Sequence, residues 1–139
     1  MTDATRGSCH CGAVVFEVRL SDGIDTASRC DCSLCAKRGA VTVSAQREAI
    51  TFLQGADKLT LYQFGTKTAE HYFCSVCGIY THHRRRSDPT EIGVNLACLD
   101  GYSPYLPEVP VGDGQNHSTD TGLDRQAGRL LFIPSRDKA

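Results

Sequence analysis

The sequence predicts an all-β domain built from short, mainly antiparallel strands. Short runs of apolar and β-branched residues alternate with turn signals that contain glycine, a pattern typical of antiparallel sheets. No stretch shows the sustained apolar period of a long amphipathic helix. A length of 139 residues suits one domain with a sizeable core, so we expect a single domain over residues 1–139.

The first expected strands surround a cysteine-rich segment. Residues 12–20 are β-branched and partly alternating, which predicts a strand. A second strand is expected over residues 24–32, followed by a short turn or single helical turn at residues 33–38. Gly39 then breaks the chain, and residues 40–45 predict a further strand.

The middle of the chain continues the same pattern. Residues 50–54 predict a short strand, and residues 58–64 alternate clearly between apolar and polar side chains. Residues 68–73 and 78–84 flank a cysteine pair, which predicts two strands joined by a tight turn. Residues 91–99 form the most apolar candidate strand.

The last part of the chain predicts more loop than strand. Prolines and glycines cluster between residues 104 and 114, and residues 129–133 predict an edge strand. We expect flexible ends at residues 1–6 and 135–139.

Composition excludes several classes of partner. Fifteen basic residues balance 16 acidic ones, so no global field attracts nucleic acid or anionic lipid. No apolar run is long enough to span a bilayer, and the first residues lack the apolar segment of a signal peptide. We therefore expect a cytoplasmic protein with no nucleic-acid or membrane partner.

Seven of the eight cysteines form three groups, spaced C-x-C, C-x-C-x2-C and C-x2-C-G. Members of each group are too close in sequence for relaxed disulfides, and a reducing compartment favours metal binding. Cys9, Cys11, Cys74 and Cys77 have the spacing of a closed zinc site, in which neighbouring sulfurs lie about 3.8 Å apart. The alternative is that these four side chains pack as small hydrophobic groups.

The central group, Cys30, Cys32 and Cys35, supplies three metal ligands and leaves one position open, as in catalytic zinc sites. Either a substrate fills the open position or no metal stays bound. Ser33 either donates a hydrogen bond to a thiolate or caps the turn. Cys98 lies in an apolar run and is expected in the core.

Basic residues cluster only at residues 82–86. In a strand, Arg84 and Arg86 share one face and can bind substrate carboxylates, whereas Arg85 shares the other face with His83. The alternative is a solvated strand end.

His117 lies in a turn-rich segment that can fold over the three-cysteine group. It is a candidate fourth ligand or general base, and the alternative is a loop histidine bonded to the backbone.

Residues 7–12, 30–35 and 73–78 resemble the three cysteine motifs of the glutathione-dependent formaldehyde-activating enzyme family, which also contains centromere protein V-like proteins. The resemblance extends through residues 82–86 and 113–117. It implies stacked, tent-like antiparallel sheets stabilised by zinc. It also implies a carbon–sulfur lyase that, in reverse, joins glutathione and formaldehyde into S-hydroxymethylglutathione.

The resemblance further implies two zinc ions: a structural Zn²⁺ on Cys9, Cys11, Cys74 and Cys77, and a second, more labile one on Cys30, Cys32 and Cys35. The expected partners are a thiol, with glutathione first, and a small aldehyde, in a monomer or homodimer. Two other functions remain open, a zinc-binding module without turnover and a thiol-based redox sensor that releases zinc on oxidation.

Overall fold

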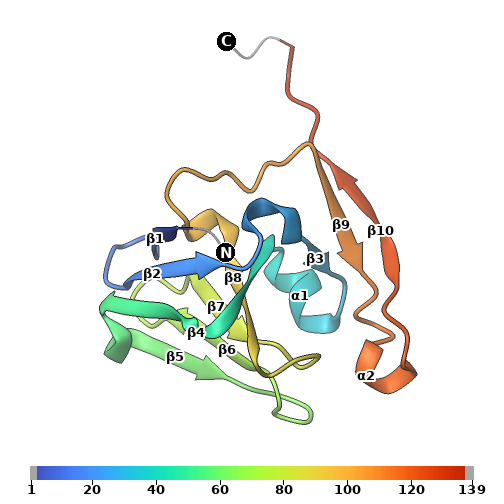
Figure 1. Cartoon of the computed structure of the whole chain (residues 1–139), viewed down its shortest axis with the longest axis horizontal. Helices are drawn as coiled ribbons and strands as arrows, with labels where there is room; N and C mark the ends of the chain where they lie inside the picture. The colour runs from blue at the N-terminus through green and yellow to red at the C-terminus, as the bar shows by residue number, and fades with distance from the viewer. Residues whose placement is uncertain (1–2, 137–139) are drawn as a thin grey trace.

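A computed structural model describes residues 3–136, which form ten strands, two short α-helices and three 3-10 helices (Figure 1). The strands are β1 (Ala4–Ser8), β2 (Val15–Leu20), β3 (Arg29–Cys30), β4 (Thr42–Gln54), β5 (Leu59–Tyr62), β6 (Glu70–Cys74), β7 (Tyr80–Arg84), β8 (Glu91–Asn95), β9 (Glu108–Gly112) and β10 (Gln126–Leu131). The helices are α1 (Ser33–Arg38), α2 (Ser118–Thr121), η1 (Gly23–Thr26), η2 (Ala56–Lys58) and η3 (Leu96–Cys98). The predicted all-β, mainly antiparallel fold is confirmed.

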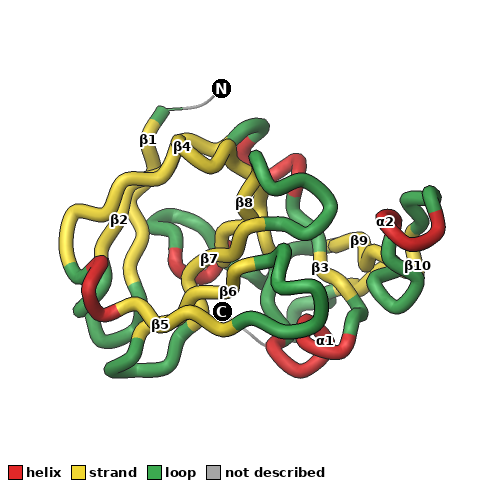
Figure 2. Tube along the Cα trace, turned by 90° about the horizontal axis from the view of Figure 1, so that it is seen from below, coloured by secondary structure: helices red, strands yellow, loops and turns green. Residues whose placement is uncertain are grey.

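Seven strands form one antiparallel sheet in the order β1-β2-β4-β8-β7-β6-β5. The long strand β4 joins its two halves, because residues 42–46 pair with β8 and residues 45–54 pair with β2. Figure 2 shows the strands following one another around a strongly curved layer. Alternate residues of β2 point into the core, which is why Phe16, Val18 and Leu20 are fully buried.

The small sheet has the order β10-β9-β3 and contains the parallel pairing of β3 with β9. In that pairing Cys30 lies opposite Gly112. The segment that follows β9 is therefore held beside the three-cysteine group. β9 and β10 form a hairpin at one side of the molecule, with α2 at its end (Figure 1).

The prediction of a strand over residues 24–32 is wrong. Gly23 adopts a left-handed φ of 54°, and the amide of Asp25 donates to the carbonyl of Asp22, so the chain turns into η1 instead. Only Arg29–Cys30 pairs as a strand. The helical turn expected at residues 33–38 is present as α1, which ends at Gly39 in a left-handed conformation.

Two other boundaries also differ from expectation. The strands expected at residues 40–45 and 50–54 are one strand, β4, because the polar residues between them lie on its exposed middle. The strand expected over residues 91–99 ends at Asn95, where the side chain accepts from the amide of Ala97 and begins η3.

Strands β1 and β9 were not expected. β1 is polar, and its Gly7 lies against the ring of Phe16, where a Cβ would come within 2.6 Å of Cζ. It begins at Ala4, inside the range expected as a flexible end. β9 contains Pro110, which favoured a loop interpretation. Residues 1–2 and 137–139, which belong to the expected flexible ends, lie outside the described residues.

Candidate functional site

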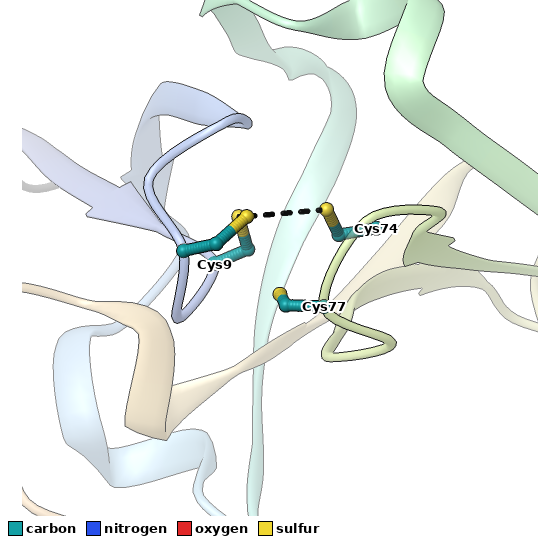
Figure 3. Close-up of side chains that lie close together, drawn as sticks. Cys9, Cys74 and Cys77 are labelled. Carbon is teal, nitrogen blue, oxygen red and sulfur yellow. Dashed lines mark hydrogen bonds between the residues drawn. The ribbon is translucent and has the colours of Figure 1, made fainter.

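Four cysteines meet between two turns of the large sheet. Cys9 and Cys11 come from the turn between β1 and β2, Cys74 ends β6, and Cys77 lies in the turn before β7. Their four sulfur atoms all lie within 4.8 Å of one another. The labelled side chains in Figure 3 point toward a common centre from two different turns.

The backbone of both turns directs the cysteine side chains toward one another. Gly12 and Gly78 follow the second cysteine of each pair with φ of 81° and 79°, which favours glycine. The amide of Val14 donates to Cys9 Sγ at 3.3 Å, and the amide of Val76 donates to Cys74 Sγ at 3.4 Å. Amides directed at sulfur stabilise thiolates, which is the form that binds metal.

The donor set of this cluster fits a tetrahedral zinc ion. The Sγ atoms of Cys9 and Cys11 lie 3.7 Å apart, and those of Cys11 and Cys74 lie 3.8 Å apart. Four thiolates around zinc require a separation of about 3.8 Å. The backbone amide of Cys11 contributes most to lowering the pKa of Cys77, to about 6. These four cysteines could hold a metal ion with a complete set of four sulfur ligands.

The three remaining grouped cysteines form a second cluster where β3 meets α1. Their sulfur atoms lie within 4.8 Å of one another. The amide of Cys32 donates to Cys30 Sγ, and the amide of Cys35 donates to Cys32 Sγ, both at 3.4 Å. Cys32 thereby caps the N-terminus of α1 with its sulfur.

The thiols of this cluster influence one another's ionisation strongly. Hydrogen bonds from Cys30 and Cys35 lower the pKa of the Cys32 thiol far below its usual range. The contacts with Cys30 and then Cys32 raise the pKa of the Cys35 thiol. One thiolate therefore forms easily, and its negative charge opposes a second. A shared dication removes this opposition, so the donor set suits a metal with three thiolate ligands.

A pocket of about 500 Å³ opens beside the three-cysteine cluster and not beside the four-cysteine one. Its size lies within the range of sites for small organic ligands. The expected site residues that line it are Cys30, Cys32, Ser33, Cys35, Arg86 and His117.

The pocket lining is strongly basic. It contains the four arginines Arg29, Arg38, Arg85 and Arg86, against Asp120 as its acidic member. Arg86 already pairs with Asp120, Nη2 to Oδ1 at 2.6 Å. Arg85 is also paired, Nε to Oε1 of Glu91 at 3.7 Å, and no ion pair is found for Arg29 or Arg38 among the described residues. The lining keeps an excess of positive charge, which suits an anionic ligand.

The arginines at the end of β7 differ in their position relative to the pocket. Arg84 lies outside the pocket lining, and its Nη2 bonds to the carbonyl of Thr68 at 2.9 Å and pairs with Glu70 at 3.3 Å. Arg85 lines the pocket with His83. Arg86 also reaches the pocket, because β7 ends at Arg84 and strict alternation stops there.

His117 lines the pocket but is not part of the metal-ligand cluster. It caps α2, where its Nδ1 accepts from the amide of Thr119 at 3.1 Å. The geometry thus places His117 as a pocket residue held by its own backbone turn.

Asp31 secures the loop that carries His117. Its Oδ1 accepts from the amide of Gly114 at 2.7 Å and from that of Gln115 at 3.2 Å. A Cβ at Gly114 would collide with the sulfur of Cys30 and come 2.9 Å from Cβ of Cys32. The loop therefore packs directly on the cysteine cluster, and only glycine allows this approach.

Several residues in and around the pocket were not expected from the sequence. Arg38 donates through Nη2 to Cys35 Sγ at 3.5 Å, and its position three residues later on a helical turn could have indicated this contact. Asp31 lies between Cys30 and Cys32, and a carboxylate at this position can accept hydrogen bonds from the amides of a neighbouring loop. No local pattern marks His71, which reaches the pocket only through the pairing of β6 with β7.

Cys98 lies in the core as expected. It is buried in η3, and its Sγ donates to the carbonyl of Tyr80 at 3.5 Å. It belongs to neither cluster.

The sequence model of the glutathione-dependent formaldehyde-activating enzyme family matches residues 4–111. The chain belongs to this family. The match covers both cysteine clusters and ends inside β9. The family assignment expected from the three cysteine motifs is therefore confirmed.

Two known proteins are similar to this chain. A Halomonas elongata protein named "Putative glutathione-dependent formaldehyde-activating enzyme" is 38% identical over 79 residues, which are 51% of this chain and 50% of that protein. The chain thus matches about half the length of this curated relative. The crystal structure of a Rhodobacter sphaeroides protein is 56% identical with a TM-score of 0.75, covering 76% of this chain and 98% of that one. No helix within residues 3–136 is long and apolar enough to cross a membrane.

Proposed function

We propose that this protein is a zinc-dependent carbon–sulfur lyase-type enzyme that joins a thiol, with glutathione as the leading candidate, to formaldehyde or a small aldehyde. The observation that carries the proposal is the three-cysteine cluster, which opens onto a basic pocket of about 500 Å³. Membership of the glutathione-dependent formaldehyde-activating family supports the choice of thiol and aldehyde.

We assign one zinc ion to each cysteine cluster. When bound by Cys30, Cys32 and Cys35, zinc would supply a site that holds the substrate sulfur as a thiolate. The four-cysteine zinc is structural because its ligand set is complete. The three-cysteine zinc is the more labile one, since it has fewer protein ligands and lies at a pocket. Thiolate ligands persist in a reducing compartment, so the proposal places the protein in the cytoplasm.

The pocket residues bind and orient the thiol. Glutathione carries two carboxylates, and guanidinium groups bind carboxylates through two parallel N–H donors. Arg85 and Arg86 follow β7 directly and line the pocket. We assign to these two arginines the carboxylate-binding role first expected for Arg84 and Arg86. His117 lies on the loop above the cluster and can exchange protons with the bound adduct.

The proposal is tested by the rate of glutathione–formaldehyde adduct formation, followed by ¹³C NMR with and without the zinc-loaded protein. Acceleration that depends on protein concentration supports the proposal. An equal rate with and without protein contradicts the glutathione–formaldehyde activity. Release of one zinc by mild peroxide, reversed by reductant and without any acceleration, would favour the redox sensor instead.

A pair of adjacent arginines provides a matched control. Replacement of Arg85 by Gln should raise the KM for glutathione about 10- to 100-fold, the effect of losing one charge-assisted contact. Arg84→Gln is the same change one residue away, outside the pocket, and should leave KM within about twofold. Equal effects of the two substitutions would argue against a carboxylate site at Arg85.

A further inference from the structure

Arg38 holds three different groups around the edge of the pocket. Its Nη2 donates to Cys35 Sγ at 3.5 Å, and its Cζ lies 3.7 Å above the ring of Tyr80. Its Nη1 lies 3.0 Å from Nδ1 of His71. No ion pair with a carboxylate is found for Arg38 among residues 3–136. Its charge therefore faces a thiol, an imidazole and an aromatic ring.

The contact with Arg38 determines the tautomer of His71. A guanidinium has five N–H donors and no acceptor, so Nδ1 of His71 must accept. The ring proton of the neutral imidazole then resides on Nε2. Burial, followed by the charge of Arg38, lowers the pKa of His71 to about 4, so the ring is neutral at neutral pH.

Two further rings stack on the ring of His71. The Phe64 ring lies at 5.9 Å with an interplanar angle of 23°, and the His83 ring lies at 5.2 Å and 21°. A tilt of the ring would weaken both stacking contacts, and a 180° flip, which keeps them, would place a carbon beside Arg38 in place of Nδ1 and lose that hydrogen bond. The Nε2–H group is thus kept in one orientation.

The Nε2 edge of His71 opens to the pocket. His71 lines the pocket together with the three cysteines. Within the described part of the chain, Nε2 has no hydrogen-bond partner. Nε2 is nevertheless not fully buried. The fully buried side-chain atoms without a hydrogen-bond partner in that part of the chain are Oγ of Ser21 and Nε of Arg38 and Arg85. Because the rest of the His71 side chain is buried and the residue lines the pocket, we infer that Nε2 is reached from the pocket.

We propose that His71 is a catalytic hydrogen-bond donor whose Nε2–H binds the aldehyde oxygen at the three-cysteine site, and that Arg38 is the positioning residue that fixes this tautomer. This inference rests on the proposed function. The sulfur lone pair forms the S–C bond while the π pair of C=O moves onto oxygen. The thiol proton leaves to solvent on binding, and the new alkoxide takes a proton from water.

Such a donor acts where negative charge develops. A neutral imidazole N–H that is already oriented stabilises an oxyanion without reorganising, and loss of one such donor typically costs about 10²- to 10³-fold in rate. His117 is less suited to this role, because its Nδ1 is engaged with Thr119 and its turn holds it on the loop. Tyr80 is engaged with Nδ1 of His83 at 2.6 Å and with the carbonyl of Gly93 at 3.2 Å.

The tautomer can be tested without turnover. Long-range ¹H–¹⁵N NMR of the zinc-loaded, ¹⁵N-histidine-labelled protein should show His71 protonated at Nε2 and not at Nδ1. The Arg38→Met protein should show a mixture of tautomers at His71, an effect that a merely structural arginine would not produce. Protonation at Nδ1 in the wild-type protein would overturn the inference.

The donor role has a second probe that is independent of activity. S-(carboxymethyl)glutathione carries a carboxylate near the position of the adduct oxygen. Its addition should shift the Nε2 proton of His71 downfield, and an unchanged resonance in the saturated complex would overturn the donor role. If both NMR results hold while the wild-type protein shows no adduct formation, the donor assignment stands and the proposed reaction fails.

Two amide substitutions separate the two nitrogens of His71. Gln can place an amide N–H near the Nε2 position, whereas Asn reaches only the Nδ1 position beside Arg38. We expect His71→Asn to lower kcat about 10²- to 10³-fold and His71→Gln to stay within about tenfold of wild type. Zinc content should be unchanged in both. Full activity of His71→Asn with both zinc ions bound would overturn the proposal.

Discussion

The two cysteine clusters use the same ligand atom in different surroundings. The four-cysteine cluster joins two turns at the end of the large sheet, with Cys9 and Cys74 buried. The three-cysteine cluster lies at the junction of β3 and α1, and all three cysteines are partly exposed at a basic pocket. Ligand type alone therefore does not distinguish the two sites. The two sites differ in the number of cysteines and in the pocket that lies beside the three-cysteine cluster.

Under the proposed function, the closed cluster is a structural site and the open cluster is the site of chemistry. The closed cluster is supported by backbone amides and by the core that contains Cys9 and Cys74. The open cluster is surrounded by side chains that can bind or donate, among them Arg38, His71 and Arg85. Loss of the first should remove the fold, and loss of the second should remove the chemistry.

The largest effect is expected from Cys74→Ser. Structural zinc contributes about 10–16 kcal/mol of apparent binding free energy in small zinc domains, comparable to the whole stability of a domain. The variant should lose the four-cysteine zinc and unfold at ambient temperature, as measured by circular dichroism and metal analysis. Cys98→Ala is the control, a buried cysteine outside both clusters, and should cost about 1 kcal/mol. A folded Cys74→Ser protein without that metal would show that the closed cluster is not structural.

Cys32→Ser should affect chemistry without unfolding the protein. Zinc should fall from two equivalents to one, and adduct formation should be lost, because the remaining cluster keeps only two sulfur ligands. The circular dichroism spectrum should match that of the wild type. Ser33→Ala lies in the same pocket and should retain both zinc ions. Retention of two zinc ions by the Cys32→Ser protein would contradict the assignment of the second zinc to the three-cysteine cluster.

Gly114→Ala tests the loop that covers the open cluster. The added Cβ would collide with Cys30, so the loop must move and the Asp31 hydrogen bonds must lengthen. We expect the affinity for the second zinc to fall about 10- to 100-fold, the usual effect of disturbing groups around metal ligands. Gly112→Ala is the matched control, since its Cβ would lie 3.7 Å from the nearest atom, the carbonyl oxygen of Arg29. Zinc titration with a competing chelator measures both.

The last prediction concerns pH and involves neither cluster directly. Burial lowers the pKa of His82 to about 4, and its ring stacks on Tyr72 at 4.8 Å. The unfolded chain takes up this proton below pH 6.5, whereas the folded protein does not. The free energy of unfolding should therefore fall as pH decreases from 6.5 to 4, by up to about 3 kcal/mol for this group.

His82→Phe isolates that contribution, because it keeps an aromatic ring and removes the titrating group. Its stability should depend less steeply on pH between 4 and 6.5 than that of wild type, as measured by urea unfolding across this range. Protonation of the cysteine ligands affects both proteins alike, so it cancels in the difference. Identical slopes would contradict a neutral buried His82.

Much of the fold was predictable because local patterns agree with the tertiary structure. The alternation of β2 and the two strands around Cys74 and Cys77 follow from apolar period and turn residues. The ends of the strands were less predictable. The strand expected over residues 24–32 failed because the turn at Gly23 continues into η1. β9 was missed because Pro110 favoured a loop interpretation and because its parallel partner β3 is distant in sequence.

The sequence by itself determined the family, the all-β class and the grouping of the cysteines, since cysteine spacing and strand period are local properties of the chain. Only the tertiary structure decided which side chains face the open cluster. It replaced Arg84 with Arg85 in the pocket, and it brought Arg38, His71 and the Gly114 loop around the three thiols. These neighbours come from separate elements whose strand pairing and register set their positions, and no local pattern encodes that register.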